Sequence, residues 1–204
     1  MTNIYLTRHG QTEWNVVKRM QGHKNSDLTE LGQKQAAALG LALKDIQIDK
    51  IYCSSSQRTL DTARLIKGNR NIEIIPTDDL MEISLGCWEG HTFDEVEAQY
   101  PEKFDNFWNH PEKYVPIDGE TFEDVRNRTA KVMKLIAEKE NGKNILVVTH
   151  GIVLKTIYTY FMNQDIAEVY NSQHPRSTCL CHVIREDSVW KVMKWNDTDH
   201  YKYI

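Results

Sequence analysis

Hydrophobic residues along the chain follow two patterns, short continuous apolar runs and longer segments with apolar positions three or four residues apart. The first pattern is typical of buried strands and the second of amphipathic helices. We expect strands at residues 3–7, 50–53, 73–76 and 144–149, followed by a hairpin of about 178–185 and 189–195 that turns at residues 186–188. We expect helices at about 29–43 with Thr29 as N-cap, after the serines 54–56 through Ile66, at about 121–139, and from Gly151 onward.

Strands that alternate with helices predict a three-layer α/β/α sandwich with a mostly parallel sheet. The length of 204 residues and the lack of repeats or a linker favour one domain over residues 1–204. Residues 88–122 mix aromatic and acidic positions, and we interpret them as a small helical lid insertion. The alternative is a helical pair that only packs its aromatic side chains on the domain, which is the commoner use of such residues.

Composition and charge exclude several classes of function. The net charge of −4 argues against a nucleic-acid binder, and no segment approaches the ~20 apolar residues of a membrane span. The first residues lack the layout of a signal peptide, so we expect a cytoplasmic protein. Four scattered cysteines do not suggest a disulfide framework. The oligomeric state is not readable from the sequence.

Histidine and arginine follow three of the predicted strands: Arg8-His9-Gly10, Ser54 onward to Arg58, and Thr149-His150-Gly151. Carboxyl ends of parallel strands meet at one edge of a sheet, where ligands bind. Arg58 falls in the first turn of its helix, where backbone N–H groups also favour anions. Any one of these motifs alone is better explained as an ordinary strand terminus or a solvated arginine. Together they predict one anion pocket.

Further polar residues are candidates to line this pocket. Asn15, Gln21 and Gly22 follow the first motif in a polar loop. Glu82 lies in an irregular, glycine-punctuated segment from which a carboxylate could reach the rim, and Glu89 lies nearby in the same segment. Residue chemistry alone does not choose between the two carboxylates.

An ordered series of motifs resembles the histidine phosphatase superfamily, whose members are similar to phosphoglycerate mutase. The resemblance covers essentially the whole chain. Its motifs are Arg8–Asn15 with Gln21-Gly22 and residues 27–32, residues 54–63, Glu82–Gly90, residues 119–121, Val148–Gly151 and residues 195–200.

The resemblance implies a role for each matching residue. His9 would be the phosphorylated nucleophile, Arg8, Arg58 and His150 would bind the transferring phosphoryl group, and Glu82 would be the proton donor. Asn15, Gln21, Gly22 and Gly151 would complete the substrate site. Phosphoryl transfer needs mainly positioning and charge stabilisation, which two arginines and a protonatable histidine provide without a metal or other cofactor.

Departures from the mutases of the family favour a phosphatase. Those mutases carry a Glu-Arg-aromatic-Tyr-Gly type of segment where this chain reads Glu82-Ile83-Ser84-Leu85-Gly86, so the residues that would hold a glycerate carboxylate are absent. We therefore expect a phosphomonoester hydrolase that acts on small phosphorylated metabolites. The alternatives are a mutase, a phosphatase for a cobalamin precursor or a sugar phosphate, and a phospho-ligand binding module without turnover.

Other histidines and cysteines point to no metal site. Cys179 and Cys181 alternate along a predicted strand and would share one buried face. His23, His91, His110, His174 and His200 are scattered, and we expect them at the surface.

Overall fold

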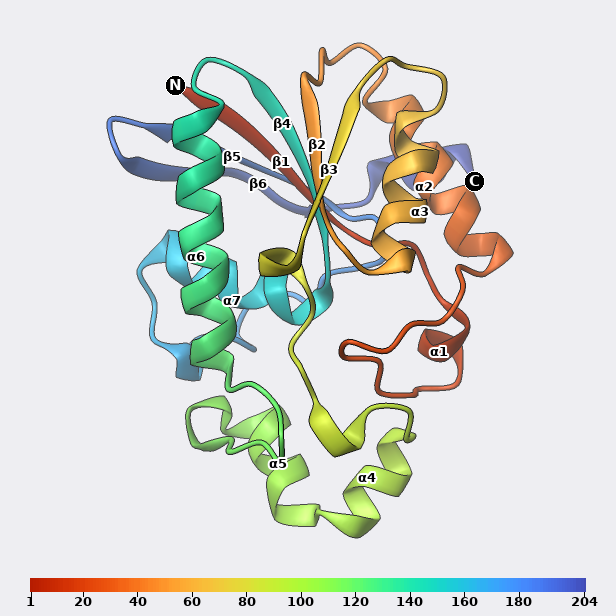
Figure 1. The fold of residues 1–204 in the computed structure, drawn as a ribbon, viewed down its shortest axis with the longest axis vertical. Helices are drawn as coiled ribbons and strands as arrows, with labels where there is room; N and C mark the ends of the chain where they lie inside the picture. The colour runs from red at the N-terminus through yellow and green to blue at the C-terminus, as the bar shows by residue number, and fades with distance from the viewer.

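All 204 residues are described by the computed structural model, which has a central sheet between two helical layers (Figure 1). The sheet contains six strands in the order β3-β2-β4-β1-β5-β6. Their bounds are β1 Thr2–Arg8, β2 Lys50–Ser54, β3 Glu73–Thr77, β4 Asn144–Thr149, β5 Leu180–Glu186 and β6 Val189–Asp197. The first four strands are mutually parallel, and β5 and β6 join them as an antiparallel hairpin. The three-layer fold with a mostly parallel sheet is confirmed.

Helices cover both faces of the sheet, as Figure 1 shows, with α2 and α3 on one face and α6 and α7 on the other. The helices are α1 Glu13–Val16, α2 Glu30–Ala42, α3 Gln57–Lys67, α4 Phe93–Gln99, α5 Pro101–Asn109, α6 Phe122–Lys139 and α7 Gly151–Met162, and the chain also has five short 3-10 helices, two of them after α7. None of the helices is both long and apolar enough to cross a bilayer.

Strand alternation divides the apolar residues between two core layers. Ile145 and Val147 of β4 pack in the cluster on the α6 and α7 side. Leu146 and Val148, the intervening residues, pack in the cluster on the α2 and α3 side. Because successive side chains in a strand point to opposite faces, a strand that is apolar at every position is buried on both sides. This explains why the residues of β4 form a continuous apolar run.

Two helices start at threonine caps: Thr29 was predicted as an N-cap, and Thr121 only as the approximate start of a helix. The Thr29 side chain accepts a hydrogen bond from the Gly32 N–H at the start of α2. Thr121 and Asp124 form a reciprocal capping box at the start of α6. Each cap satisfies backbone donors that a helix cannot satisfy internally, so the two boundaries could be predicted from local chemistry.

The closing hairpin differs from the prediction at the start of its first strand and at its turn. Thr178 has a positive φ of 53° and therefore lies outside the strand, which begins at Leu180. Asp187 and Ser188 also have positive φ values, as a two-residue turn of this kind requires. Glu186 thus pairs with Val189 and is not a turn residue, contrary to the expectation. Cys179 and Cys181 are both completely buried in the same core cluster.

Two further expectations need correction. The polar loop after Gly10 contains the short helix α1, which no apolar periodicity announces because none of its residues is buried. His200 is only 3% exposed, although we expected it at the surface. Its Nε2 lies 3.1 Å from the Thr178 Oγ1, and this hydrogen bond compensates its burial.

The segment 88–122 forms the small helical body at the bottom of Figure 1, with α4 and α5 as its two helices. Its centre is Trp88, which is 2% exposed and packs against Phe107 and Tyr114 with ring centroids 5.7 and 5.5 Å away. These rings therefore serve packing, as the alternative interpretation held. Phe93 and Trp108, however, are only partly buried and face a cavity described below. Whether the segment moves as a lid stays a prediction.

Candidate active site

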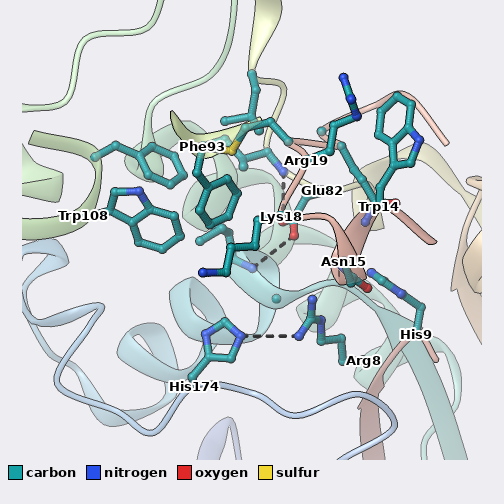
Figure 2. A pocket seen from close by; sticks show the side chains of 18 of the residues that line it. Arg8, His9, Trp14, Asn15, Lys18, Arg19, Glu82, Phe93, Trp108 and His174 are labelled. Carbon is teal, nitrogen blue, oxygen red and sulfur yellow. Dashed lines mark hydrogen bonds between the residues drawn. The ribbon is translucent and has the colours of Figure 1, made fainter. Parts of the chain in front are cut away.

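A cavity of about 390 Å³ lies between the carboxyl ends of the strands and the segment 88–122 (Figure 2). Eight of the nine predicted site residues line it: Arg8, His9, Asn15, Gln21, Gly22, Arg58, Glu82 and Gly151. The ninth, His150, lies directly beside His9, with ring centroids 5.3 Å apart, but has no surface on the cavity. The structure thus brings together residues that are more than 140 positions apart in the chain.

His9 stands at the end of β1, where the strand gives way to a tight loop. Its N–H continues the parallel pairing by donating to the Thr149 carbonyl at 2.9 Å. Gly10 follows because a side chain does not fit there: a Cβ would lie 2.5 Å from the Gly32 carbonyl oxygen of α2. The backbone of Gly10 is not in the left-handed region, so the turn does not require a glycine at this position. The close packing against α2 explains why the residue has no side chain.

The imidazole of His9 is held in one tautomer. Its Nδ1 lies 2.7 Å from the Gly10 carbonyl oxygen, which can only accept, so Nδ1 carries the proton and Nε2 keeps its lone pair. Burial, and after it the charges of Arg58 and Arg8, lower the pKa of His9 well below its usual value. The ring is therefore neutral at pH 7 and has the free lone pair that a nucleophile needs.

Two arginines flank His9, and each is fixed by backbone carbonyls. The Arg58 guanidinium donates to the carbonyls of Lys24 at 2.7 Å and Gly22 at 2.8 Å. Burial lowers the pKa of Arg58 to about 10, so it stays charged at neutral pH. The Arg8 guanidinium donates to the Pro175 carbonyl at 3.0 Å. Burial lowers the pKa of Arg8 as well, while the Glu82 carboxylate opposes this shift.

His150 begins α7 and is completely buried. Its Nε2 lies 2.9 Å from the Ser54 Oγ at the end of β2. Burial, followed by the charge of Arg58, lowers the pKa of His150 well below its usual value. We expected a protonatable histidine that supplies positive charge, whereas this lowered pKa implies a neutral ring at pH 7.

Three nitrogens around His9 are buried and have no hydrogen-bond partner: Arg8 Nε, Arg58 Nε and His150 Nδ1. An unpaired buried polar group costs about 1–3 kcal/mol, so a group of three around one imidazole calls for a specific explanation. Their presence in three residues grouped around one imidazole indicates a site for an anion with several acceptor oxygens.

Glu82 and Glu89, which the sequence did not distinguish, have different surroundings. Glu82 lines the cavity, and its carboxylate accepts hydrogen bonds from the N–H of Ile83 at 3.0 Å and of Ile152 in α7 at 3.3 Å, the latter close to the hydrogen-bond limit. Glu89 is nearly buried and accepts from three backbone N–H groups of residues 23, 24 and 85. Glu89 therefore ties two loops together, and only Glu82 has a carboxylate on the cavity.

The loop residues on the cavity are held mainly by each other. The Gln21 side-chain amide donates to the Thr12 hydroxyl at 2.8 Å, and the Asn15 side-chain Oδ1 accepts from the Thr12 N–H at 3.1 Å. Gly22 has a positive φ of 51°, and a Cβ there would lie 2.2 Å from the Glu89 carboxylate. At Gly151 a Cβ would lie 3.6 Å from the Arg8 Nε, so glycine keeps the space between Arg8 and Glu82 open.

Several residues of the cavity were not anticipated. They are Trp14, Lys18, Arg19, Tyr170 and His174, with four apolar residues at positions 20, 83, 85 and 152, whereas Phe93, Phe107 and Trp108 belong to the aromatic positions of the predicted lid insertion. His174 is exposed, as we expected, but its Nε2 also lies 3.4 Å from an Arg8 nitrogen at the cavity (Figure 2). Desolvation and the Arg8 charge lower the pKa of His174 to about 4. Among these unanticipated residues, the adjacent basic pair Lys18-Arg19, in the same loop as Asn15, is the signal in the sequence that would have pointed to the cavity.

Comparison with known proteins decides the family. The family model described as the histidine phosphatase superfamily (branch 1) matches residues 4–198. The chain belongs to this superfamily. The relatives of the chain in this superfamily support a phosphatase activity.

Similar proteins include a metal-independent phosphoserine phosphatase from Arabidopsis thaliana, 34% identical over 98% of this chain and 83% of that protein. The structure of YhfR from Bacillus stearothermophilus is similar over 98% of this chain and 99% of that one, with 38% identity and a TM-score of 0.97. A phosphoserine phosphatase mutant from Entamoeba histolytica in complex with phosphoserine covers 98% and 99% of the two chains, with 27% identity and a TM-score of 0.86.

Proposed function

We propose that this histidine phosphatase hydrolyses small phosphomonoesters through a phosphohistidine formed on His9. The observation that carries the proposal is the state of the His9 ring: neutral, with Nδ1 occupied by the Gly10 carbonyl, which leaves Nε2 free, and with the charges of Arg58 and Arg8 acting on the ring. A neutral imidazole can form a bond to phosphorus, and the arginines stabilise the charge that spreads over the phosphoryl oxygens.

In the first step the Nε2 lone pair of His9 forms a bond to phosphorus while the ester P–O bond breaks. The alcohol oxygen takes the proton of the Glu82 carboxyl group and leaves as a neutral alcohol. The Nδ1–H of His9 stays on the Gly10 carbonyl and fixes the ring during the attack. Glu82 suits the role of proton donor because it has a carboxylate on the cavity, whereas the oxygens of Glu89 are bound by backbone N–H groups.

In the second step water replaces the alcohol. The Glu82 carboxylate takes a proton from water, the water oxygen attacks phosphorus, and the P–N bond breaks. Inorganic phosphate leaves, and His9 and Glu82 return to their starting protonation states. Arg8 and Arg58 would hold the phosphoryl oxygens in both steps, and the neutral His150 ring would pack beside the His9 ring.

Phosphoserine is the first natural substrate to test, because two of the similar proteins are phosphoserine phosphatases. The proposal requires no metal ion, since the positive charge at the phosphoryl site comes from Arg8 and Arg58. Activity should therefore persist in a chelator and should not increase when Mg²⁺ is returned.

The test is turnover of p-nitrophenyl phosphate and phosphoserine by the wild-type protein, His9→Asn, and the matched control His110→Asn, which changes an exposed histidine outside the cavity. We expect turnover by the wild type and the control and none by His9→Asn. Rapid acid-free quenching with labelled substrate should trap an adduct that is stable to base and labile to acid. Wild-type turnover retained by His9→Asn, or an acid-stable adduct, would overturn the proposal.

A further inference from the structure

The rim of the cavity carries positive charge that the proposed reaction does not use. Four cationic side chains line the cavity, Arg8, Lys18, Arg19 and Arg58, against a single carboxylate, Glu82. Arg8 and Arg58 belong to the phosphoryl site. Lys18 and Arg19 come from the loop after α1, and their function needs a separate explanation.

Arg19 already has partners in the protein. Its guanidinium donates to the Gly90 carbonyl and lies 5.8 Å from the centre of the Trp14 ring. The backbone around it pairs with the start of the segment 88–122, where Met20 N–H donates to the His91 carbonyl at 2.8 Å. Arg19 therefore fastens the loop to that segment and is half-buried in doing so.

Lys18 has no such partner. Its side chain is exposed, and its ammonium group forms no hydrogen bond or ion pair within the protein. Figure 2 shows this side chain across the front of the cavity, among the labelled residues Arg8, Phe93 and His174. Of the four cations, Lys18 alone presents an unused charge to a bound molecule.

The backbone holds Lys18 at this place under strain. Its φ is 51°, in the left-handed region that glycine adopts freely and a lysine does not. The conformation is fixed because the Lys18 carbonyl accepts from the Phe93 N–H at 3.0 Å. A glycine would adopt this positive φ with less backbone strain. The turn itself therefore does not explain why a long cationic side chain stands at this position.

We propose that Lys18 binds a carboxylate on the alcohol part of the substrate, so that the enzyme prefers phosphorylated carboxylic acids to uncharged phosphomonoesters. The proposal rests on the phosphatase function proposed above and adds the substrate class. A carboxylate fits better than a second phosphate, because one ammonium balances one negative charge and Arg19 is already engaged. His174, the other basic group at this end, has a pKa of about 4 and contributes no charge at pH 7.

The experiment compares 3-phosphoglycerate with glycerol 3-phosphate, which replaces the carboxylate by a neutral CH₂OH group. The readout is the ratio of the two kcat/KM values. We expect the ratio to fall about 3- to 10-fold in Lys18→Met. This range corresponds to an ion pair that is weaker than a buried one and stronger than a fully exposed one. The loss should lie in KM, because a group remote from phosphorus binds ground and transition states alike.

Three further variants separate charge from fold. Lys18→Arg keeps a cation and should keep most of the ratio, whereas Lys18→Gly relieves the backbone strain and should still lose it. Lys34→Met removes an exposed lysine of α2 that pairs with Glu30 away from the cavity, and it should leave the ratio unaltered. Added salt should lower the ratio in the wild type but not in Lys18→Met.

Each result decides a different claim. If the wild type hydrolyses both esters and Lys18→Met keeps the wild-type ratio, the role of Lys18 is wrong while the phosphatase function stands. The same conclusion holds if Lys18→Met slows both esters equally, since that describes a structural defect. If the wild type hydrolyses neither ester nor p-nitrophenyl phosphate, the phosphatase function fails and the Lys18 proposal with it.

Discussion

The Nδ1 of His9 lies 2.7 Å from the carbonyl oxygen of Gly10, the residue that follows it in the chain. A local contact thus decides which ring nitrogen is available for chemistry. Because the carbonyl cannot donate, the proton must stay on Nδ1, and the free Nε2 is the atom left to attack. Burial and the two flanking arginines then keep the ring neutral by lowering its pKa.

From this pKa we predict how activity depends on pH. A histidine whose pKa is lowered stays neutral as the pH falls through 6.5, so protonation of His9 should not reduce kcat/KM until the pH is well below that value. A titration of the labelled His9 ring by NMR gives the same pKa without interference from the substrate. Replacing Arg58 by Met removes the largest charge acting on the ring and should move the His9 titration to higher pH. A wild-type titration at or above pH 6.5 would contradict this account.

A second prediction concerns the mutase reaction. The segment after Glu82 places the apolar Ile83 on the cavity and binds the Ser84 N–H to the Glu120 carboxylate at 2.9 Å. Neither residue offers a cation or a phenol, and the single ammonium group of Lys18 would not by itself retain a phosphoglycerate for reorientation. We expect phosphate release from 3-phosphoglycerate with negligible formation of 2-phosphoglycerate, measured together by ³¹P NMR. Isomerisation faster than phosphate release would show that the phosphatase interpretation is wrong.

The third prediction concerns stability at the opposite edge of the sheet. Glu140 is 1% exposed, and its carboxylate accepts hydrogen bonds from Lys50, Tyr52 and Lys143. Burial alone would raise the pKa of Glu140, yet these donors lower it from 4.5 to about 2. A carboxyl with a lowered folded-state pKa stabilises the fold above its unfolded pKa and loses this contribution as the pH falls toward 2.

Glu140→Gln should therefore lower the free energy of unfolding at pH 7 by on the order of 2 kcal/mol. The difference from wild type should shrink between pH 4.5 and 2, as measured by urea denaturation at several pH values. Glu138→Gln is the matched control, since Glu138 is an exposed carboxylate with a surface ion pair to Arg185, and it should change stability by less than about 1 kcal/mol. A Glu140→Gln effect that is constant with pH would contradict the linkage.

Local patterns in the sequence predicted the sheet, its helices and the residues at the strand ends, because strand ends and caps depend on short-range chemistry. His9, Arg58 and His150 converge because parallel strands place their carboxyl ends at one edge. Other parts of the site depend on packing between distant segments. His174 lies at the cavity next to Arg8, which also binds the Pro175 carbonyl, and nothing in the residues around His174 indicates these contacts.

Glu82 and Glu89 are a second case in which contacts between distant segments could not be predicted from the sequence. Glu82 and Glu89 lie seven residues apart, and their residue types and glycine-rich surroundings are alike. They differ in which backbone N–H groups reach them. Those of residues 23 and 24, which bind Glu89, come from another loop, and the Ile152 N–H near Glu82 comes from α7. Such long-range pairings cannot be inferred from spacing along the chain.

The fourth prediction tests Glu82 as the proton donor. Glu82→Gln should slow hydrolysis of alkyl phosphates by roughly 10²–10⁴-fold, the contribution expected of a general acid. The loss in the first step should be much smaller for p-nitrophenyl phosphate, whose leaving group needs little protonation. The second step still requires the carboxylate to activate water, so phosphohistidine should accumulate. Stopped-flow absorbance should then show a burst of nitrophenol close to one equivalent per enzyme.

Glu89→Gln is the control for this prediction, because it makes the same carboxylate-to-amide change at the neighbouring glutamate. Its oxygens hold the N–H groups of residues 23, 24 and 85, so weakening them should destabilise the fold by about 1–3 kcal/mol. Any loss of activity should follow the loss of folded protein and be equal for alkyl and nitrophenyl esters, without a burst. If Glu89→Gln instead gives the leaving-group dependence while Glu82→Gln remains nearly as active as wild type, Glu89 is the acid. His9 and the two arginines would keep their roles, because the phosphorylation step at Nε2 does not depend on which carboxyl group protonates the alcohol.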